Sequence, residues 1–159
     1  MEAIDYLCGI GKIIGNLHSL ELLLRLFLSK TNGESLQNPQ FVNETLPVTH
    51  LTNYSSLRVL INEYNSILID TERCFVVDLS VVTIRDAIAH GRLTSLNKEF
   101  PLTLWKFSKP LKSNKNTVNV ELMEVISTVW LDNKRQLILD QINIIDACAN
   151  SRNYKPFGE

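Results

Sequence analysis

The sequence predicts a mainly α-helical protein with a β-hairpin before its last helix, and three observations lead to this class. The chain has 159 residues, the size of one domain, so we expect a single domain over residues 1–159. Apolar residues recur at helical spacing in several long segments. Residues 101–122 instead contain two short segments that alternate apolar and polar residues, as paired strands do. We therefore expect about four to five helices and one hairpin.

The first expected helix covers residues 3–30, where apolar positions follow the i, i+3, i+4 rhythm. These positions are Ile4, Leu7, Gly11, Ile14, Leu17, Leu20, Leu24 and Leu28. Gly33 lies just beyond the helix and is a suitable stop, because glycine readily adopts the left-handed backbone that ends many helices.

A loop and a second helix are expected next. Residues 31–50 are rich in Asn, Pro, Thr and Ser, so we expect a long loop there. The apolar rhythm returns in Leu57–Leu68, and Thr52 or Asn53 is the expected N-cap of this helix.

The third expected helix runs from Glu72 to Ala89, after a cap at Asp70 or Thr71. Its run Cys74–Ile84 is rich in β-branched residues and is also compatible with a buried strand. We favour a helix because the run continues without a break to Ala89, and Gly91 then supplies a stop. Because this helix is apolar nearly all round, we expect it at the centre of the fold.

The C-terminal third of the chain predicts a hairpin followed by a helix. Pro101–Phe107 and Thr117–Leu122 alternate apolar and polar residues, with a polar stretch between them. The last helix is expected over Met123–Ala149. The tail Ser151–Glu159 is polar and contains Pro and Gly, so we expect it to be flexible.

Composition and charge exclude several classes of protein. The net charge of −1 excludes a generally basic nucleic-acid binder, so phosphate contacts would need a local patch. The cysteines Cys8, Cys74 and Cys148 form no CxxC pair, and we expect buried thiols rather than a disulfide, a metal site or a cofactor site. We find no N-terminal targeting signal and no apolar run of about 18 residues. We therefore expect a cytoplasmic protein without a membrane partner.

One pair of residues predicts chemistry. Arg85 and His90 lie five residues apart at the end of the third expected helix. Histidine exchanges a proton near neutral pH, and arginine holds a phosphate through two parallel hydrogen bonds. Together they suit cleavage of RNA without a metal, because the 2′-hydroxyl of RNA supplies the nucleophile.

The same residues also have ordinary structural interpretations. The spacing is short and common, so by itself it is weak support for a site. A histidine in the last turn of a helix is stabilised by the helix dipole. An adjacent Arg85 and Asp86 can form a surface salt bridge without any role in function.

The longer segment Ile84–Arg92 resembles the R-x(4–6)-H ribonuclease motif of HEPN domains, including the polar Asp86 directly after the arginine. The segment Asn16–Leu28 resembles the first long helix of such domains. Within it, Glu21 and Arg25 look like the E-x-x-x-K/R pair of some HEPN toxins. The resemblance covers roughly residues 5–150, and the hairpin departs from the minimal all-helical domain as an insertion.

This resemblance implies an up-and-down helical bundle that forms a homodimer, in which two R-x(4–6)-H segments build one composite ribonuclease site. It implies that Arg85 and His90 are catalytic and that Asp86 orients them. It also implies a role in a toxin–antitoxin or other defence system, with an antitoxin or another regulatory protein as a possible partner. One departure is that Gly91 and Arg92 follow His90, where many such toxins have a tyrosine.

Other residues have two interpretations each. Glu21 lies among leucines and is expected to support the site with Arg25 or Arg85 as its partner, or else to stabilise a helix surface. The basic residues of the hairpin region either contact RNA or protect a solvated sheet edge. They are Arg92, Lys106, Lys109, Lys112 and Lys115. Trp105 and Phe107 either stack bases or belong to the core.

The sequence therefore predicts a metal-independent RNA endonuclease of HEPN type with RNA and a second copy of the chain as partners. The alternative is a non-catalytic HEPN-like helical module that binds a partner protein or a nucleotide. A duplex-DNA regulator has little support, because no helix with a basic face suited to the major groove is evident.

Overall fold

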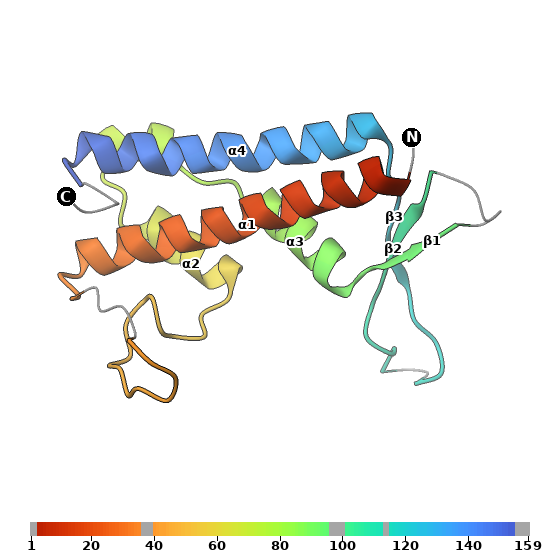
Figure 1. Cartoon of the computed structure of the whole chain (residues 1–159), viewed down its shortest axis with the longest axis horizontal. Helices are drawn as coiled ribbons and strands as arrows, with labels where there is room; N and C mark the ends of the chain where they lie inside the picture. Colours follow the sequence, from red (N-terminus) through yellow and green to blue (C-terminus); the bar gives the residue numbers. More distant parts are fainter. Residues whose placement is uncertain (1–2, 36–39, 96–100, 113–114, 155–159) are drawn as a thin grey trace. The chain divides into compact units, whose positions relative to one another are not determined.

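A computed structural model describes residues 3–35, 40–95, 101–112 and 115–154, and it is mainly α-helical (Figure 1). The mainly α class is therefore confirmed, and the arrangement of the helices as an up-and-down bundle stays a prediction. In chain order the elements are α1 (Ala3–Thr31), α2 (Leu57–Ser66), the 3₁₀-helix η1 (Asp70–Phe75), α3 (Ser80–His90), β1 (Arg92–Thr94), β2 (Thr103–Phe107), β3 (Val120–Val125) and α4 (Thr128–Ser151).

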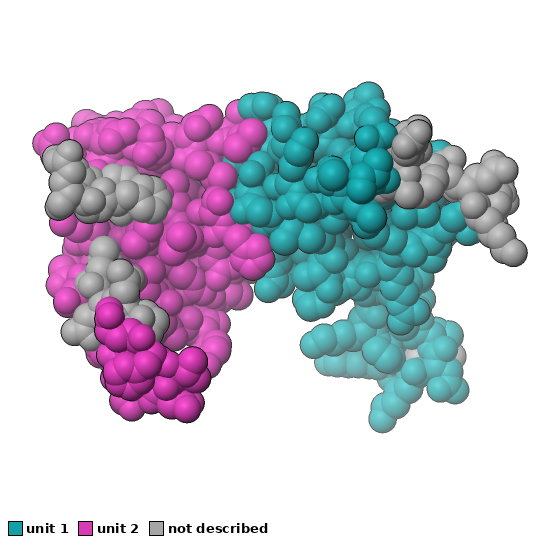
Figure 2. All heavy atoms as spheres, in the orientation of Figure 1, with its two compact units in different colours: residues 1–16, 80–138 teal, residues 17–79, 139–159 magenta. Residues whose placement is uncertain are grey.

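The chain divides into two compact units, which are described separately (Figure 2). Unit 1 comprises residues 1–16 and 80–138, and unit 2 comprises residues 17–79 and 139–159. Unit 1 therefore contains α3, the sheet and the first parts of α1 and α4. Unit 2 contains the later parts of α1 and α4, together with α2 and η1. The expected single domain over residues 1–159 stays a prediction.

The first helix has the predicted extent, but part of its predicted buried face is wrong. Gly33 has a φ of +65° and ends the helix as expected. In the first half, however, Ile4, Leu7 and Ile14 are 61%, 68% and 39% exposed. Tyr6 and Ile13 are buried instead, because the Tyr6 hydroxyl accepts a hydrogen bond from the N–H of Leu102, 96 residues away.

The segment Ile4–Thr31 of α1 is long and apolar enough to span a membrane, by length and composition, with a mean hydropathy of 1.3. The expectation that no segment reaches this limit is therefore not confirmed. A core helix, which is mostly buried, can have the same composition; in this segment 28% of the apolar window is buried, including Leu20, Leu24 and Leu28 of unit 2. The expected absence of a membrane partner stays a prediction.

The N-cap of the second helix lies three or four residues later than expected. Its N-cap is Ser56, whose hydroxyl accepts a hydrogen bond from the N–H of Val59, so Thr52 and Asn53 are not the caps. Its apolar stripe faces the core of unit 2, where the rings of Phe27 and Tyr64 meet edge to face at 4.9 Å.

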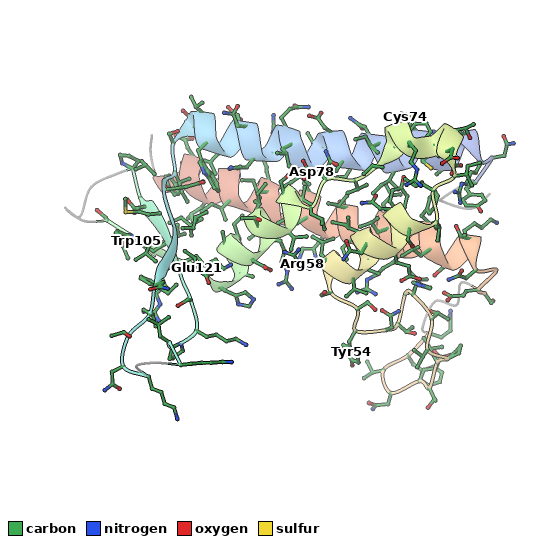
Figure 3. All side chains as sticks on the ribbon, turned by 180° about the vertical axis from the view of Figure 1, so that it is seen from behind. Tyr54, Arg58, Cys74, Asp78, Trp105 and Glu121 are labelled. Carbon is green, nitrogen blue, oxygen red and sulfur yellow. The ribbon has the colours of Figure 1, made fainter. Side chains whose placement is uncertain are left out.

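The third helix is shorter than predicted. Residues 72–89 do not form one helix, because η1 is followed by a non-helical segment, and α3 begins only at Ser80. The Asn65 side chain accepts a hydrogen bond from the N–H of Val77 and donates one to its carbonyl, both at 2.9 Å. The Gln141 side chain accepts from the N–H of Asp78 at 2.8 Å (Figure 3). These side chains satisfy the backbone groups that a helix would otherwise pair.

Unit 1 contains a small antiparallel sheet in the order β1-β2-β3. The edge strand β1 was not predicted. The start of the last helix at Met123 is wrong, because β3 continues to Val125, where Val125 pairs with Thr103. Helix α4 then begins after Ser127, whose hydroxyl accepts a hydrogen bond from the N–H of Trp130. The C-terminal residues 155–159 of the expected flexible tail lie outside the described residues.

The expectation of three buried thiols is wrong for two of them. Cys8 and Cys74 are exposed, and Cys148 is buried (Figure 3). Cys8 lies on the first half of α1, where the predicted register fails, and Cys74 lies in η1, outside any long helix.

Candidate functional site

Helix α3 carries the two predicted catalytic residues, Arg85 at its middle and His90 at its last residue. The helix packs through an apolar face formed by Val81, Val82, Ile84 and Ala87. This packing turns Arg85 and Asp86 to the edge of the buried face, where they are partly exposed, and leaves His90 exposed in the last turn. The predicted helix end is confirmed, because α3 stops at His90.

Gly91 determines how α3 ends. Its N–H donates a hydrogen bond to the carbonyl of Ala87 at 2.7 Å. A Cβ at this position would lie 2.1 Å from that carbonyl oxygen and 2.6 Å from the Leu104 side chain of β2. Only glycine fits this approach, so the contact between α3 and the sheet positions His90 and Arg92 on either side of Gly91.

The Arg85 guanidinium is held by the next residue. Its Nη1 donates to Oδ1 of Asp86 at 3.0 Å, and the two side chains are 41% and 31% exposed. A pair this exposed adds little to stability. Since one contact uses only one of the five N–H groups, the others can hold an anion. Asp86 thus contacts Arg85 as expected, and its role in catalysis stays a prediction.

His90 and Arg85 diverge within one chain. Five residues on an ideal helix correspond to a rotation of about 140° and a rise of about 7.5 Å. In the described part of the chain, no residue forms an ion pair with His90, and Asp86 is the ion-pair partner of Arg85. Both groups of the pair are therefore open to solvent.

The predicted supporting pair Glu21 and Arg25 lies in unit 2 and holds a loop. Arg25 donates to Oε1 of Glu21 from Nε and Nη2, at 3.0 and 2.8 Å. Its Nη1 donates to the carbonyls of His50 and Asn53, at 2.6 and 3.2 Å, and Nη2 donates to the carbonyl of Ser55 at 2.8 Å. Because the Arg25 side chain is only 11% exposed, we assign this pair to loop positioning, and a role in catalysis stays a prediction.

Unit 2 also contains a charged cluster that the sequence did not indicate, formed by Glu34, His50 and Glu63 (the His50 cluster). The His50 ring nitrogens lie 2.7 Å from Oε1 of Glu34 and 2.8 Å from Oε1 of Glu63. Burial alone would lower the pKa of His50, but the two carboxylates outweigh it and raise that pKa. Burial also opposes ionisation of Glu34, yet hydrogen bonds from His50 and Ser29 lower the pKa of this carboxyl.

The predicted RNA-contacting basic residues differ in their surroundings. Lys106 forms an ion pair with Glu121 of β3, at 3.2 Å (Figure 3). Lys109 and Lys112 are exposed in the loop that follows β2. The Arg92 guanidinium lies over the Phe107 ring, 5.6 Å from its centroid. Contact of these residues with RNA stays a prediction.

Two cavities of unit 1 are lined by described residues that do not include Arg85 or His90. One, of about 280 Å³, lies between the first part of α1 and α4, and its lining includes Lys12 and Arg135. The other, of about 180 Å³, lies between α3, β3 and α4. No cluster of three His, Cys, Asp or Glu residues suited to a metal ion occurs within residues 3–35, 40–95, 101–112 and 115–154.

Comparison with known proteins does not identify a family. No family model, curated protein or solved structure matches the chain. The resemblance to HEPN domains therefore depends on the residues around Arg85 and His90.

Proposed function

We propose that the protein is a metal-independent RNA endonuclease of HEPN type, with Arg85 and His90 as catalytic residues. The observation that carries the proposal is the exposure of both side chains on α3, with Arg85 at the middle of the helix and His90 at its last residue, directly before Gly91. The helix thus presents a proton-transferring group and a permanently charged phosphate-binding group to solvent.

The reaction follows from these two groups. His90 removes the proton from a ribose 2′-hydroxyl, and the 2′ oxygen then bonds to the adjacent phosphorus. Arg85 stabilises the negative charge that develops on the phosphate oxygens. The bond from phosphorus to the 5′ oxygen breaks, and this oxygen takes up a proton. The products are a 2′,3′-cyclic phosphate and a 5′-hydroxyl end.

A second copy of the chain completes this site. Because Arg85 and His90 point about 140° apart on one helix, they are poorly placed to act on the same phosphate from one chain. Across a two-fold axis, Arg85 of one copy can approach His90 of the other. We therefore propose a cytoplasmic homodimer with an up-and-down bundle and a hairpin insertion, which acts in a toxin–antitoxin or other defence system under a regulatory protein.

The test is cleavage of single-stranded RNA by the purified protein in EDTA. His90→Ala and Arg85→Ala should each abolish cleavage, with the cyclic phosphate end detected only in the wild-type reaction. His18→Ala is the matched control, because His18 is an exposed histidine on α1, and it should leave cleavage unchanged. Cleavage that survives both His90→Ala and Arg85→Ala would contradict the proposal.

A second candidate function is a non-catalytic module that binds a partner protein or a nucleotide. It is favoured by the open position of the pair, since His90 is exposed and the Arg85 side chain is 41% exposed. Under this hypothesis, growth of cells that express the protein should not depend on His90. Growth arrest that His90→Ala relieves would favour the ribonuclease instead.

A further inference from the structure

The face of the sheet turned away from α3 carries an arrangement of aromatic rings that the proposed chemistry does not use. Leu104 of β2 is buried against the end of α3, as its approach to Gly91 shows. Since side chains alternate along a strand, Trp105 and Phe107 lie on the face of β2 opposite to that of Leu104, and Trp105 points away from α3 (Figure 3). Both rings are partly exposed.

These two rings form one platform with Arg92. The ring planes of Trp105 and Phe107 are parallel to within 5°, and their centroids are 6.3 Å apart. Arg92 pairs with Trp105 across the β1–β2 ladder, and its guanidinium lies over Phe107. In the described part of the chain, Arg92 has no carboxylate partner within ion-pair distance. We call these three residues the aromatic face.

The part of the chain that contains the aromatic face has a different net charge from the whole chain. Residues 92–125 contain six basic and three acidic residues, a net charge of +3 in a chain whose net charge is −1. Of the acidic residues, Glu121 is paired with Lys106. Lys109, Lys112 and Lys115 are exposed on the loop directly after the aromatic face. A positive loop beside exposed π-surfaces is the combination that proteins use to bind single-stranded nucleic acids.

We propose that the aromatic face binds single-stranded RNA by stacking one base on Trp105 and the next on the Arg92 guanidinium that lies over Phe107, while the loop lysines contact phosphates. An arginine plane over an aromatic ring extends the stacking surface of that ring. Bases in a duplex are already stacked on each other, so the site selects unpaired RNA. The choice of RNA rests on the proposed ribonuclease function, and the face supplies its substrate-binding surface.

The test measures binding separately from cleavage. Fluorescence anisotropy of a labelled, unstructured RNA of about 12 nucleotides is recorded with the His90→Ala protein, which should bind without cutting. In this background, Trp105→Leu with Phe107→Leu should weaken binding at least about 25-fold, since leucine keeps the apolar bulk and removes the π-surface. Trp105→Phe with Phe107→Tyr is the matched control and should stay within about threefold of the parent.

A spectroscopic measurement keeps the proposal testable if the leucine variant fails to fold. The chain has two tryptophans, Trp105 and Trp130, so Trp130→Phe makes Trp105 the only tryptophan fluorophore. Unpaired RNA should quench this emission by stacking, and duplex RNA of the same length should quench it much less. Lys109→Ala with Lys112→Ala should reduce the salt dependence of binding.

Three outcomes would overturn the proposal. The first is unchanged affinity in the leucine variant together with unquenched Trp105 emission. The second is conversion of a dimer to a monomer by the leucine variant, which would assign the face to contact between copies. The third is equal quenching by duplex RNA. Binding that behaves as expected in a wild-type protein that does not cut RNA would instead contradict the ribonuclease function and leave the aromatic face standing.

Discussion

Replacing Arg25 tests whether the predicted supporting pair has a structural role. The guanidinium donates to Glu21 and to the carbonyls of His50, Asn53 and Ser55. Arg25→Met keeps the length of the side chain and removes every one of these hydrogen bonds. Three backbone carbonyls, the side-chain oxygen of Asn53 and one carboxylate then lose a charged donor.

The expected loss of stability follows from the burial of this group. The Arg25 side chain is 11% exposed, and that of Glu21 is 34% exposed. Removing one partner of a buried, hydrogen-bonded ion pair costs about 3–5 kcal/mol. Because water can reach some of the loop carbonyls, we expect the lower part of this range. That loss is still a large fraction of a typical free energy of unfolding, about 5–15 kcal/mol.

Urea unfolding at pH 7, followed by circular dichroism, measures the effect. Arg58→Met is the matched control, because Arg58 is exposed on α2 (Figure 3), and it should change the free energy of unfolding by less than about 0.5 kcal/mol. Glu21→Gln should cost about 1 kcal/mol in the wild type and almost nothing in Arg25→Met. A loss below about 1 kcal/mol for Arg25→Met, combined with lost RNA cleavage, would refute the structural role and favour a catalytic one.

Two further predictions concern stability. The raised pKa of His50 contributes stability below about pH 6.5 that is lost as pH rises through the folded-state value, and the lowered pKa of Glu34 contributes stability above about pH 4.5 that is lost on acidification. The free energy of unfolding, measured with urea from pH 3 to 9, should therefore be highest between these two pH values, and His50→Gln should flatten this maximum. A pH profile that His50→Gln leaves unchanged would contradict the stabilising role of the His50 cluster. Gly91→Ala should lower the free energy of unfolding by about 1–3 kcal/mol through the clash with Ala87 and Leu104. Gly11→Ala, where an added Cβ meets nothing within 4 Å, should raise it by about 0.5–1 kcal/mol, and equal effects would contradict the close-approach argument.

The sequence predicts those elements whose burial follows their own periodicity. The second half of α1 is such an element, because Leu17, Leu20, Leu24 and Leu28 repeat at helical spacing and are all buried. The first half fails because its burial depends on a distant partner. The Tyr6 hydroxyl bonds to Leu102, and this contact turns Tyr6 inward and Ile4 outward.

The break in the third expected helix also depends on partners that are distant in the sequence. Residues Cys74–Ile84 are apolar enough for either a helix or a strand, and they contain both an end of η1 and a start of α3. The segment between these elements is held by Asn65 and Gln141, which are 12 and 63 residues away from their partners. Local propensity carries no information about such partners, so the break could not be predicted from the run itself. The same reason explains why the His50 cluster was missed.

Neighbouring residues in the sequence were enough to predict two features of the candidate site. They were not enough to predict the contacts around it. Gly91 indicated the end of α3 after His90, and the adjacent Asp86 indicated a partner for Arg85. The signals do not show how close β2 lies to this glycine: besides the Ala87 carbonyl, 2.1 Å from an added Cβ, the Leu104 side chain, 13 residues away in the sequence, lies 2.6 Å from it.

The approach of β2 to Gly91 links the two proposals made for unit 1. Gly91 is followed directly by Arg92 of β1, and Arg92 pairs with Trp105 of β2. A side chain at position 91 must therefore displace the Ala87 carbonyl in the last turn of α3 or the Leu104 side chain of β2, and either shift disturbs the contact that lies between His90 and the aromatic face. Gly91→Ala should thus reduce both RNA binding and RNA cleavage, whereas His90→Ala should reduce cleavage alone. A Gly91→Ala protein that folds, binds RNA normally and still cuts it would show that neither activity depends on this contact.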